Sequence, residues 1–185
     1  MINDILNEAD QKMDKSIEAT REEFSALRAG RANPAMFSKI LVDYYGTPTP
    51  LQSLASFTSQ DARVILVSPY DVSALGSVER AIRDSDLGVN PANDGKLIRC
   101  VFPELTEERR KEYIKVARTK SEEGRVAVRN IRRNAKQDLE KLEKDGEVGK
   151  DDVTGAEKRL DGLTKKHTDE IDELLKSKEA ELLEV

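Results

Sequence analysis

Apolar residues recur every three or four positions in three long segments of this 185-residue chain. The clearest segment runs from Thr106 to Lys144, contains no proline and a single glycine, Gly124, and places its apolar or small residues on one stripe of an α-helix. At about 1.5 Å per residue such a helix is about 60 Å long. A helix cannot bury its own apolar stripe, so the pattern predicts packing against other long helices.

Matching stripes lie at both ends of the chain. Residues 2–29 show the same helical spacing, and a third helix is predicted from about Asp152 to the C-terminus. Together these stripes predict a long antiparallel three-helix bundle formed by residues 1–30 and 106–185.

Residues 31–105 follow a different pattern, in which short β-rich runs alternate with turns. Strands are expected at Lys39–Tyr45, Leu54–Ser59, Arg63–Ser68 and Lys96–Phe102. The segments GTPTP and LGVNPANDG read as turn and loop, and Asp71 or Ser73 is expected to cap a helix that ends near Ser85. The chain is therefore predicted to be α+β with two domains, the second being a small α/β, sandwich-like β-α-β unit inserted into the bundle.

The chain passes between these domains twice, and both crossings are predicted to form a hinge, at 29–31 and 103–106. The hinge residues are Gly30, Arg31, Pro103, Glu104 and Leu105. Because two adjacent single-chain crossings provide few contacts, relative motion of the domains is expected.

Composition excludes several classes. Charged residues make up 36% of the chain and aromatic residues 4%, which fits long helices with narrow cores. No apolar run reaches the roughly 18 residues of a membrane span, and no signal peptide is recognisable, so no membrane partner and a cytoplasmic location are expected. Cys100, the single cysteine, is predicted to be a buried small hydrophobe. His167 is predicted to pack in the bundle rather than bind a metal, because no second histidine or cysteine can join it.

The second helix carries an unusual charge. Between Arg109 and Lys136 there are eleven lysines and arginines against three glutamates, although the whole chain has a net charge of −5. One face of this helix, here called the arginine stripe, consists of Arg118, Arg125, Arg129, Arg132 and Lys136. Guanidinium groups suit phosphate, so the stripe indicates a binder of a polyanion. The alternative is a solvated helix face that is balanced by acidic neighbours.

Five segments carry a family resemblance: LRAGRANP (27–34), VDYYGTPTPL (42–51), SDLGVNPANDG (85–95), LTEERR (105–110) and VRNIRR (128–133). They resemble the signature segments of the ribosome recycling factor family, in the same order and over the whole chain. The resemblance implies an L-shaped molecule with the bundle as one arm. Gly155 and Gly162 depart from the better helix formers expected in the family, which lowers the expected stability of the third helix.

The resemblance also implies a function. Members of the family act after termination with elongation factor G and GTP, splitting the ribosome into subunits and releasing mRNA and tRNA. The bundle is implied to bind the 23S rRNA of the large ribosomal subunit, with Arg132 as the principal contact and Arg129 and Arg133 beside it. Arg28 and Arg31, next to the hinge, match a basic pair of the family. The competing interpretation is an ion pair within the hinge or a favourable charge at the C-terminal end of the first helix.

The chain is therefore interpreted as a monomeric translation factor that is not an enzyme and needs no cofactor or metal. No phosphate-binding glycine loop is present, so the GTP is expected to be used by the partner. Asp151 and Asp152 are interpreted as helix-capping residues rather than an acid–base pair. The alternative function is a helical adaptor or chaperone whose stripe binds an acidic protein. A sequence-specific DNA binder is disfavoured, because no short recognition helix is evident.

Overall fold

The computed structural model describes residues 1–28 and 30–184. Over this part of the chain the residues group into two compact units, called here the bundle unit and the sheet unit, each with its own hydrophobic core. The bundle unit is Met1–Phe24 with Ile114–Ala180, and the sheet unit is Ser25–Tyr113 with Glu181–Val185.

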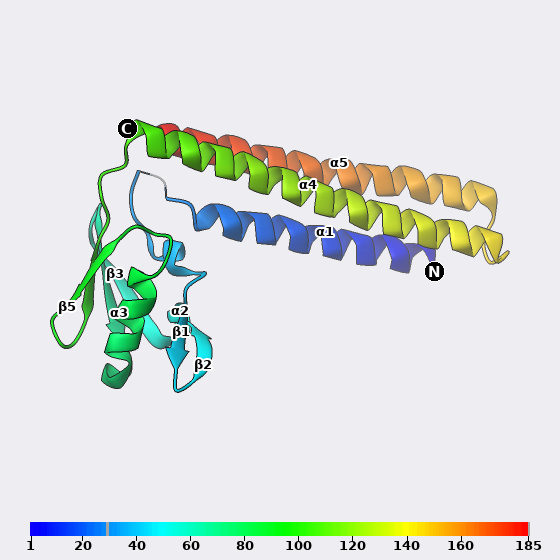
Figure 1. The fold of residues 1–185 in the computed structure, drawn as a ribbon. Helices are drawn as coiled ribbons and strands as arrows, with labels where there is room; N and C mark the ends of the chain where they lie inside the picture. The colour runs from blue at the N-terminus through cyan, green and yellow to red at the C-terminus, as the bar shows by residue number, and fades with distance from the viewer. Residues whose placement is uncertain (29, 185) are drawn as a thin grey trace. The chain divides into compact units, whose positions relative to one another are not determined.

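The bundle is made by the long helices α1 (Ile2–Ser25), α4 (Glu107–Lys144) and α5 (Lys150–Leu183). They lie side by side, with α4 running opposite to α1 and α5 (Figure 1). The buried core residues keep the three-and-four spacing of the sequence: Leu6, Ala9, Met13 and Ile17 on α1, Val128, Ala135 and Leu139 on α4, and Val153, Ala156, Leu160 and Ile171 on α5. The predicted antiparallel three-helix bundle is confirmed.

Close packing between α1 and α4 depends on Gly124. This glycine is buried, and a Cβ atom placed on it would lie 2.5 Å from Thr20 Oγ1 and 3.2 Å from Ile171 Cδ1. The Thr20 hydroxyl is held in turn by the backbone carbonyl of Ser16, at 3.0 Å. The single glycine of the second helix therefore marks a close approach of helices rather than a break in α4.

The sheet unit contains antiparallel strands only among the described residues. A hairpin pairs β1 (Leu41–Tyr44) with β2 (Thr47–Pro50), and a second sheet has the order β3-β4-β6-β5, with β3 at Ala55–Asp61, β4 at Val64–Pro69, β5 at Asn90–Asn93 and β6 at Ile98–Val101. The remaining elements are the short helices η1 (Pro34–Phe37), α2 (Leu51–Leu54) and η2 (Val72–Ala74) and the amphipathic α3 (Leu75–Arg83). The core gathers around Phe37 and Phe102, whose ring centroids are 5.9 Å apart.

Three predictions about local structure are wrong. Thr47–Pro50 of the GTPTP segment is strand β2, and Asn90–Asn93 of the LGVNPANDG segment is strand β5. Both strands contain proline but lie at sheet edges, where the missing N–H costs no ladder hydrogen bond. The turn itself is at Tyr45 and Gly46, which both have positive φ. The first helix ends at Ser25 instead of residue 29.

The other local predictions agree better with the structure. Strands β3, β4 and β6 lie within a residue or two of their predicted bounds, and Asp71 caps η2 by accepting a hydrogen bond from the Ser73 amide at 2.9 Å. Among the described residues no helix is long and apolar enough to cross a membrane. The domain boundaries, the hinge and the L shape stay predictions, and Ala29 of the hinge lies outside the described residues.

Candidate nucleic-acid interface

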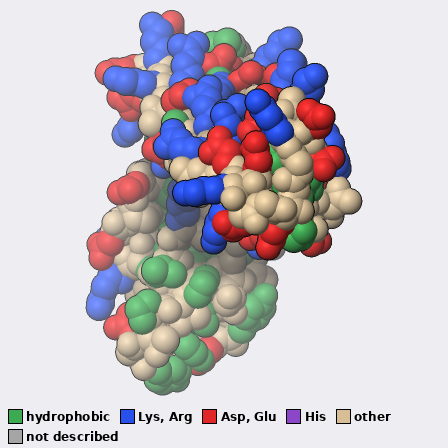
Figure 2. Space-filling model, turned by 90° about the vertical axis from the view of Figure 1, so that its right-hand side faces the viewer, with side chains coloured by type: hydrophobic (Ala, Val, Ile, Leu, Met, Phe, Trp, Pro, Cys, Tyr) green, Lys and Arg blue, Asp and Glu red, His purple; other side chains and the backbone are tan. Residues whose placement is uncertain are grey.

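The arginine stripe of α4 faces acidic side chains of α5. The Nε–carboxylate distances are 2.7 Å for Arg118–Glu179, 2.8 Å for Arg125–Asp172 and 2.7 Å for Arg132–Asp161. These arginines are seven residues apart, so they share one side of α4 and meet the antiparallel α5 about every second turn of α4. These pairs match the alternative of a helix face balanced by acidic neighbours, and basic and acidic side chains are intermixed over the bundle (Figure 2).

Arg125 is the most enclosed member of the stripe. Its side chain is 18% exposed, and its guanidinium bonds both Asp172, at 2.7 Å, and Glu122, at 2.9 Å. Burial alone lowers the pKa of this group, but the bonds to the two carboxylates outweigh burial and raise the pKa above its ordinary value. Because its donors are already used by these carboxylates, Arg125 holds α4 and α5 together rather than offering a binding group.

Arg132 and Arg118 are engaged differently. Each is bound to α5 through Nε, and their side chains are 39% and 67% exposed. A guanidinium held through Nε keeps its terminal amino groups available for a second, bidentate partner. Asp161 and Glu179 therefore orient these arginines while leaving part of each guanidinium group exposed.

The rest of the predicted contacts on α4 also lie at the surface. Arg129 is 55% exposed and lies 3.3 Å from Glu122, and Lys136 is 43% exposed and lies 4.0 Å from Glu140. Arg133 is exposed, and within residues 1–28 and 30–184 no partner is recorded for its guanidinium. Exposed ion pairs contribute only about 0–1 kcal/mol each, so these contacts exchange readily for contacts with a ligand.

The two arginines near the predicted hinge lie in different environments. Arg31 is exposed. Arg28 is 6% exposed, donates a hydrogen bond from Nη1 to the Pro103 carbonyl, and lies 5.7 Å from the centre of the Phe102 ring. Burial lowers the pKa of Arg28 from its ordinary value. The described contacts of Arg28 are thus a backbone carbonyl and an aromatic ring rather than a carboxylate, and its role in binding RNA stays a prediction.

The remaining chemistry-bearing side chains fit structural roles. Cys100 is fully buried, and burial raises the pKa of its thiol to about 12, so it is not a thiolate nucleophile. Asp71 accepts hydrogen bonds from Ser73, and Tyr44 donates its hydroxyl to the same carboxylate at 2.8 Å. Within the described residues, Asp10, Asp14 and His167 form a group whose donor atoms could hold a metal ion.

Sequence reasoning found the arginines but missed the acids that position them. Asp172 and Glu179 are seven residues apart, as Arg125 and Arg118 are, but Asp161 lies eleven residues before Asp172. The spacing of the acids along α5 therefore matches that of the arginines along α4 only in part, and the packing of the two helices brings Arg132 to Asp161.

Together, the long helical bundle with its partly exposed arginines and the small antiparallel-sheet unit define an α+β protein. The sequence model of the family described as "Ribosome recycling factor" matches residues 20–183. The chain belongs to the ribosome recycling factor family, which by its name is a family of translation factors rather than of enzymes.

Individual relatives agree over the full length. The chain is 79% identical to the ribosome-recycling factor of a Nocardioides species and 64% identical to that of Acidothermus cellulolyticus, over 185 residues and 100% of both chains in each case. Among solved structures, a solution structure of a ribosome recycling factor has a TM-score of 0.76 at 38% identity, covering 100% of this chain and 98% of that one. Another match is a Thermus thermophilus ribosome recycling factor placed with Escherichia coli elongation factor G on the Escherichia coli post-termination complex, with a TM-score of 0.67, 41% identity and full coverage of both chains.

Proposed function

We propose that this protein, with elongation factor G and GTP, disassembles the post-termination ribosome into subunits and thereby releases mRNA and tRNA. The observation that carries the proposal is the partly exposed guanidinium group of Arg132, bound to Asp161 in a chain that belongs to this family. The proposal is supported by the relative that is placed with elongation factor G on a post-termination complex. Its partners are then the large ribosomal subunit and elongation factor G, and its place of action is the cytoplasm.

In this mechanism the bundle binds 23S rRNA through phosphate contacts. Arg132 and Arg118 supply anchored guanidinium groups, and Arg129, Arg133 and Lys136 add exposed positive charge around them. Arg125 contributes rigidity, because its bond to Asp172 joins α4 to α5 and its bond to Glu122, on α4 itself, holds the guanidinium in place. A rigid bundle bound in this way transmits force along its length when the partner acts on the other domain.

The hinge provides the movement in this mechanism. The partner uses GTP to move the sheet unit, and the predicted crossings at 29–31 and 103–106 let that motion act against the bound bundle. Splitting follows when the contacts between the subunits break before the contacts of the bundle with RNA. A disulfide that fixes the hinge should therefore preserve binding to the large subunit and abolish splitting, whereas full splitting by the locked protein would refute this mechanism.

The binding step is tested by co-sedimentation with purified large ribosomal subunits at several salt concentrations. Arg132→Ala should weaken binding by on the order of 1–3 kcal/mol, the typical cost of losing a bidentate contact. Arg159→Ala is the matched control, since Arg159 is an exposed arginine of α5 that bonds Asn3 instead of a stripe acid. Equal binding by the Arg132 and Arg159 variants would contradict the site, and absence of binding by the wild type would contradict the function.

The alternative, a helical adaptor for an acidic protein, predicts a different competitor. RNA binding releases counterions and is competed by free fragments of ribosomal RNA. An adaptor would instead be competed by acidic polypeptides and would not sediment with purified subunits. We favour the ribosomal function because the family match covers most of the chain.

A further inference from the structure

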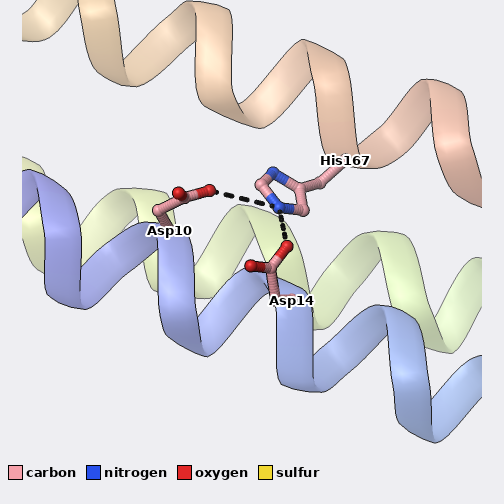
Figure 3. A group of neighbouring side chains, drawn as sticks. All are labelled: Asp10, Asp14 and His167. Carbon is pink, nitrogen blue, oxygen red and sulfur yellow. Dashed lines mark hydrogen bonds and ion pairs between the residues drawn. The ribbon is translucent and has the colours of Figure 1, made fainter.

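A buried histidine in the bundle lies against two carboxylates of another helix. His167 of α5 has no exposed area, and its Nε2 atom faces Asp10 and Asp14 of α1 (Figure 3). The two aspartates are four residues apart, so they lie on one face of α1. The three donor atoms lie within 4.8 Å of one another, and all belong to the bundle unit.

The contacts of the ring determine what Nε2 can do. The Nδ1 atom lies 2.7 Å from the Leu163 carbonyl oxygen, which only accepts hydrogen bonds, so Nδ1 carries a hydrogen. The Nε2 atom lies 2.7 Å from Asp14 Oδ1 and 3.4 Å from Asp10 Oδ1. When both aspartates are ionised, both of these atoms are acceptors, so Nε2 then carries either a proton or a bound cation.

A proton on Nε2 satisfies only one of the two carboxylates. The N–H bond points to one acceptor, and Asp14 at 2.7 Å takes that position. Asp10 Oδ1 is a buried oxygen that makes no hydrogen bond. A buried carboxylate oxygen that lacks a hydrogen bond and has only the 3.4 Å contact with His167 is costly, whereas a cation shared by all three atoms would satisfy each of them.

We propose that Asp10, Asp14 and His167 form a binding site for a divalent transition metal ion of the zinc type. Imidazole nitrogen and carboxylate oxygen are both ligands of Zn²⁺, and the Nδ1–H bond to a backbone carbonyl is the outer contact that orients metal-bound histidines. A nitrogen ligand disfavours Mg²⁺ and Ca²⁺, which prefer oxygen. The sequence-based expectation that His167 lacks partner ligands considered only histidine and cysteine and overlooked these carboxylates.

The two separations measured from His167 can be compared with those of a coordinated metal ion. Tetrahedral coordination at about 2.0–2.1 Å sets ligand atoms about 3.3 Å apart, which the Nε2–Asp10 separation of 3.4 Å already meets. Asp14 must move away by about 0.6 Å to reach that spacing, and its side chain is 61% exposed and able to do so. The exposed sides of the two aspartates also give the ion a path from solvent and leave room for a water ligand. The bound ion would join α1 to α5.

The test is calorimetric titration of the full chain with ZnCl₂ at neutral pH without chelators. One ion per chain should bind, and the melting temperature of the bundle should rise, while MgCl₂ should do neither. His167→Gln and Asp10→Asn should each weaken zinc binding by at least about tenfold. Asp169→Asn is the matched control, because Asp169 is an exposed aspartate of α5 that pairs with Lys165, and it should bind zinc as the wild type does.

Absence of zinc binding by the wild type would overturn the proposal and leave a proton on Nε2. Equal binding by the wild type, His167→Gln and Asp10→Asn would equally overturn it, because the ion would then bind elsewhere. If His167→Gln does not fold, Asp10→Asn carries the test, since it keeps the His167–Asp14 bond. Titration with Co²⁺ adds a spectroscopic measure: visible absorption typical of four-coordinate cobalt should appear in the wild type and be lost in Asp10→Asn.

Discussion

Gly124 on α4 lies where a side chain would meet α1, so Gly124→Ala tests how tightly the bundle is packed. The new Cβ would lie 2.5 Å from Thr20 Oγ1, a distance that requires atoms to shift. Overpacking a well-filled interior costs about 1–3 kcal/mol, and alanine gains about 1 kcal/mol over glycine inside a helix. We expect a net loss of about 1 kcal/mol, because Thr20 is β-branched and its hydroxyl is already bonded to Ser16.

Gly155 and Gly162 of α5 provide the matched controls. A Cβ at either position would meet nothing within 4 Å, so Gly155→Ala and Gly162→Ala should each stabilise the bundle by up to about 1 kcal/mol. The measurement is thermal and urea denaturation followed by circular dichroism. One kcal/mol corresponds to a shift in melting temperature of about 2–4 °C for a chain of this size.

A double variant isolates the contact itself. Thr20→Ala removes the clashing oxygen, and the remaining Cβ of residue 20 lies 3.7 Å from the new methyl group, which is an ordinary contact. Gly124→Ala should therefore cost less in the Thr20→Ala background than in the wild type. The reasoning is refuted if Gly124→Ala is as stable as the wild type, or if its cost is the same in both backgrounds.

Three further predictions follow from the contacts. Asp161→Asn keeps an acceptor for Arg132 Nε but removes a negative charge next to the proposed RNA contact. Binding to the large subunit should therefore tighten about two- to fivefold at low salt in the co-sedimentation assay. Weakening as large as that caused by Arg132→Ala would contradict this prediction. Arg28→Ala should destabilise the sheet unit by about 2 kcal/mol in denaturation experiments, since the Pro103 carbonyl loses its donor, and yet leave subunit binding intact in co-sedimentation. Because burial raises its thiol pKa to about 12, Cys100 should resist iodoacetamide at pH 8 in the folded protein and react rapidly after unfolding, as mass spectrometry reports; fast labelling of the native chain would show that the thiol is exposed.

The sequence by itself determined the long helices, the bundle and most central strands. These elements follow from the spacing of apolar residues, which is a local property of the chain. An apolar stripe repeated over about forty residues fits only a helix, and a β-rich run such as β4 fits a strand better than a helix. The stripe also marked Arg132 and its neighbours as charged surface residues, and the family resemblance assigned them a partner.

Tertiary structure decided what those charges face. Edge strands β2 and β5 contain Pro48 and Pro91, and only their pairing partners make them strands. Arg28 and Arg125 have the same side chain as Arg132, yet Arg28 is buried and Arg125 is bound on two sides. Likewise, His167 meets Asp14 across 153 residues of sequence. Such contacts depend on which helix faces lie together, and no local pattern in the chain records that.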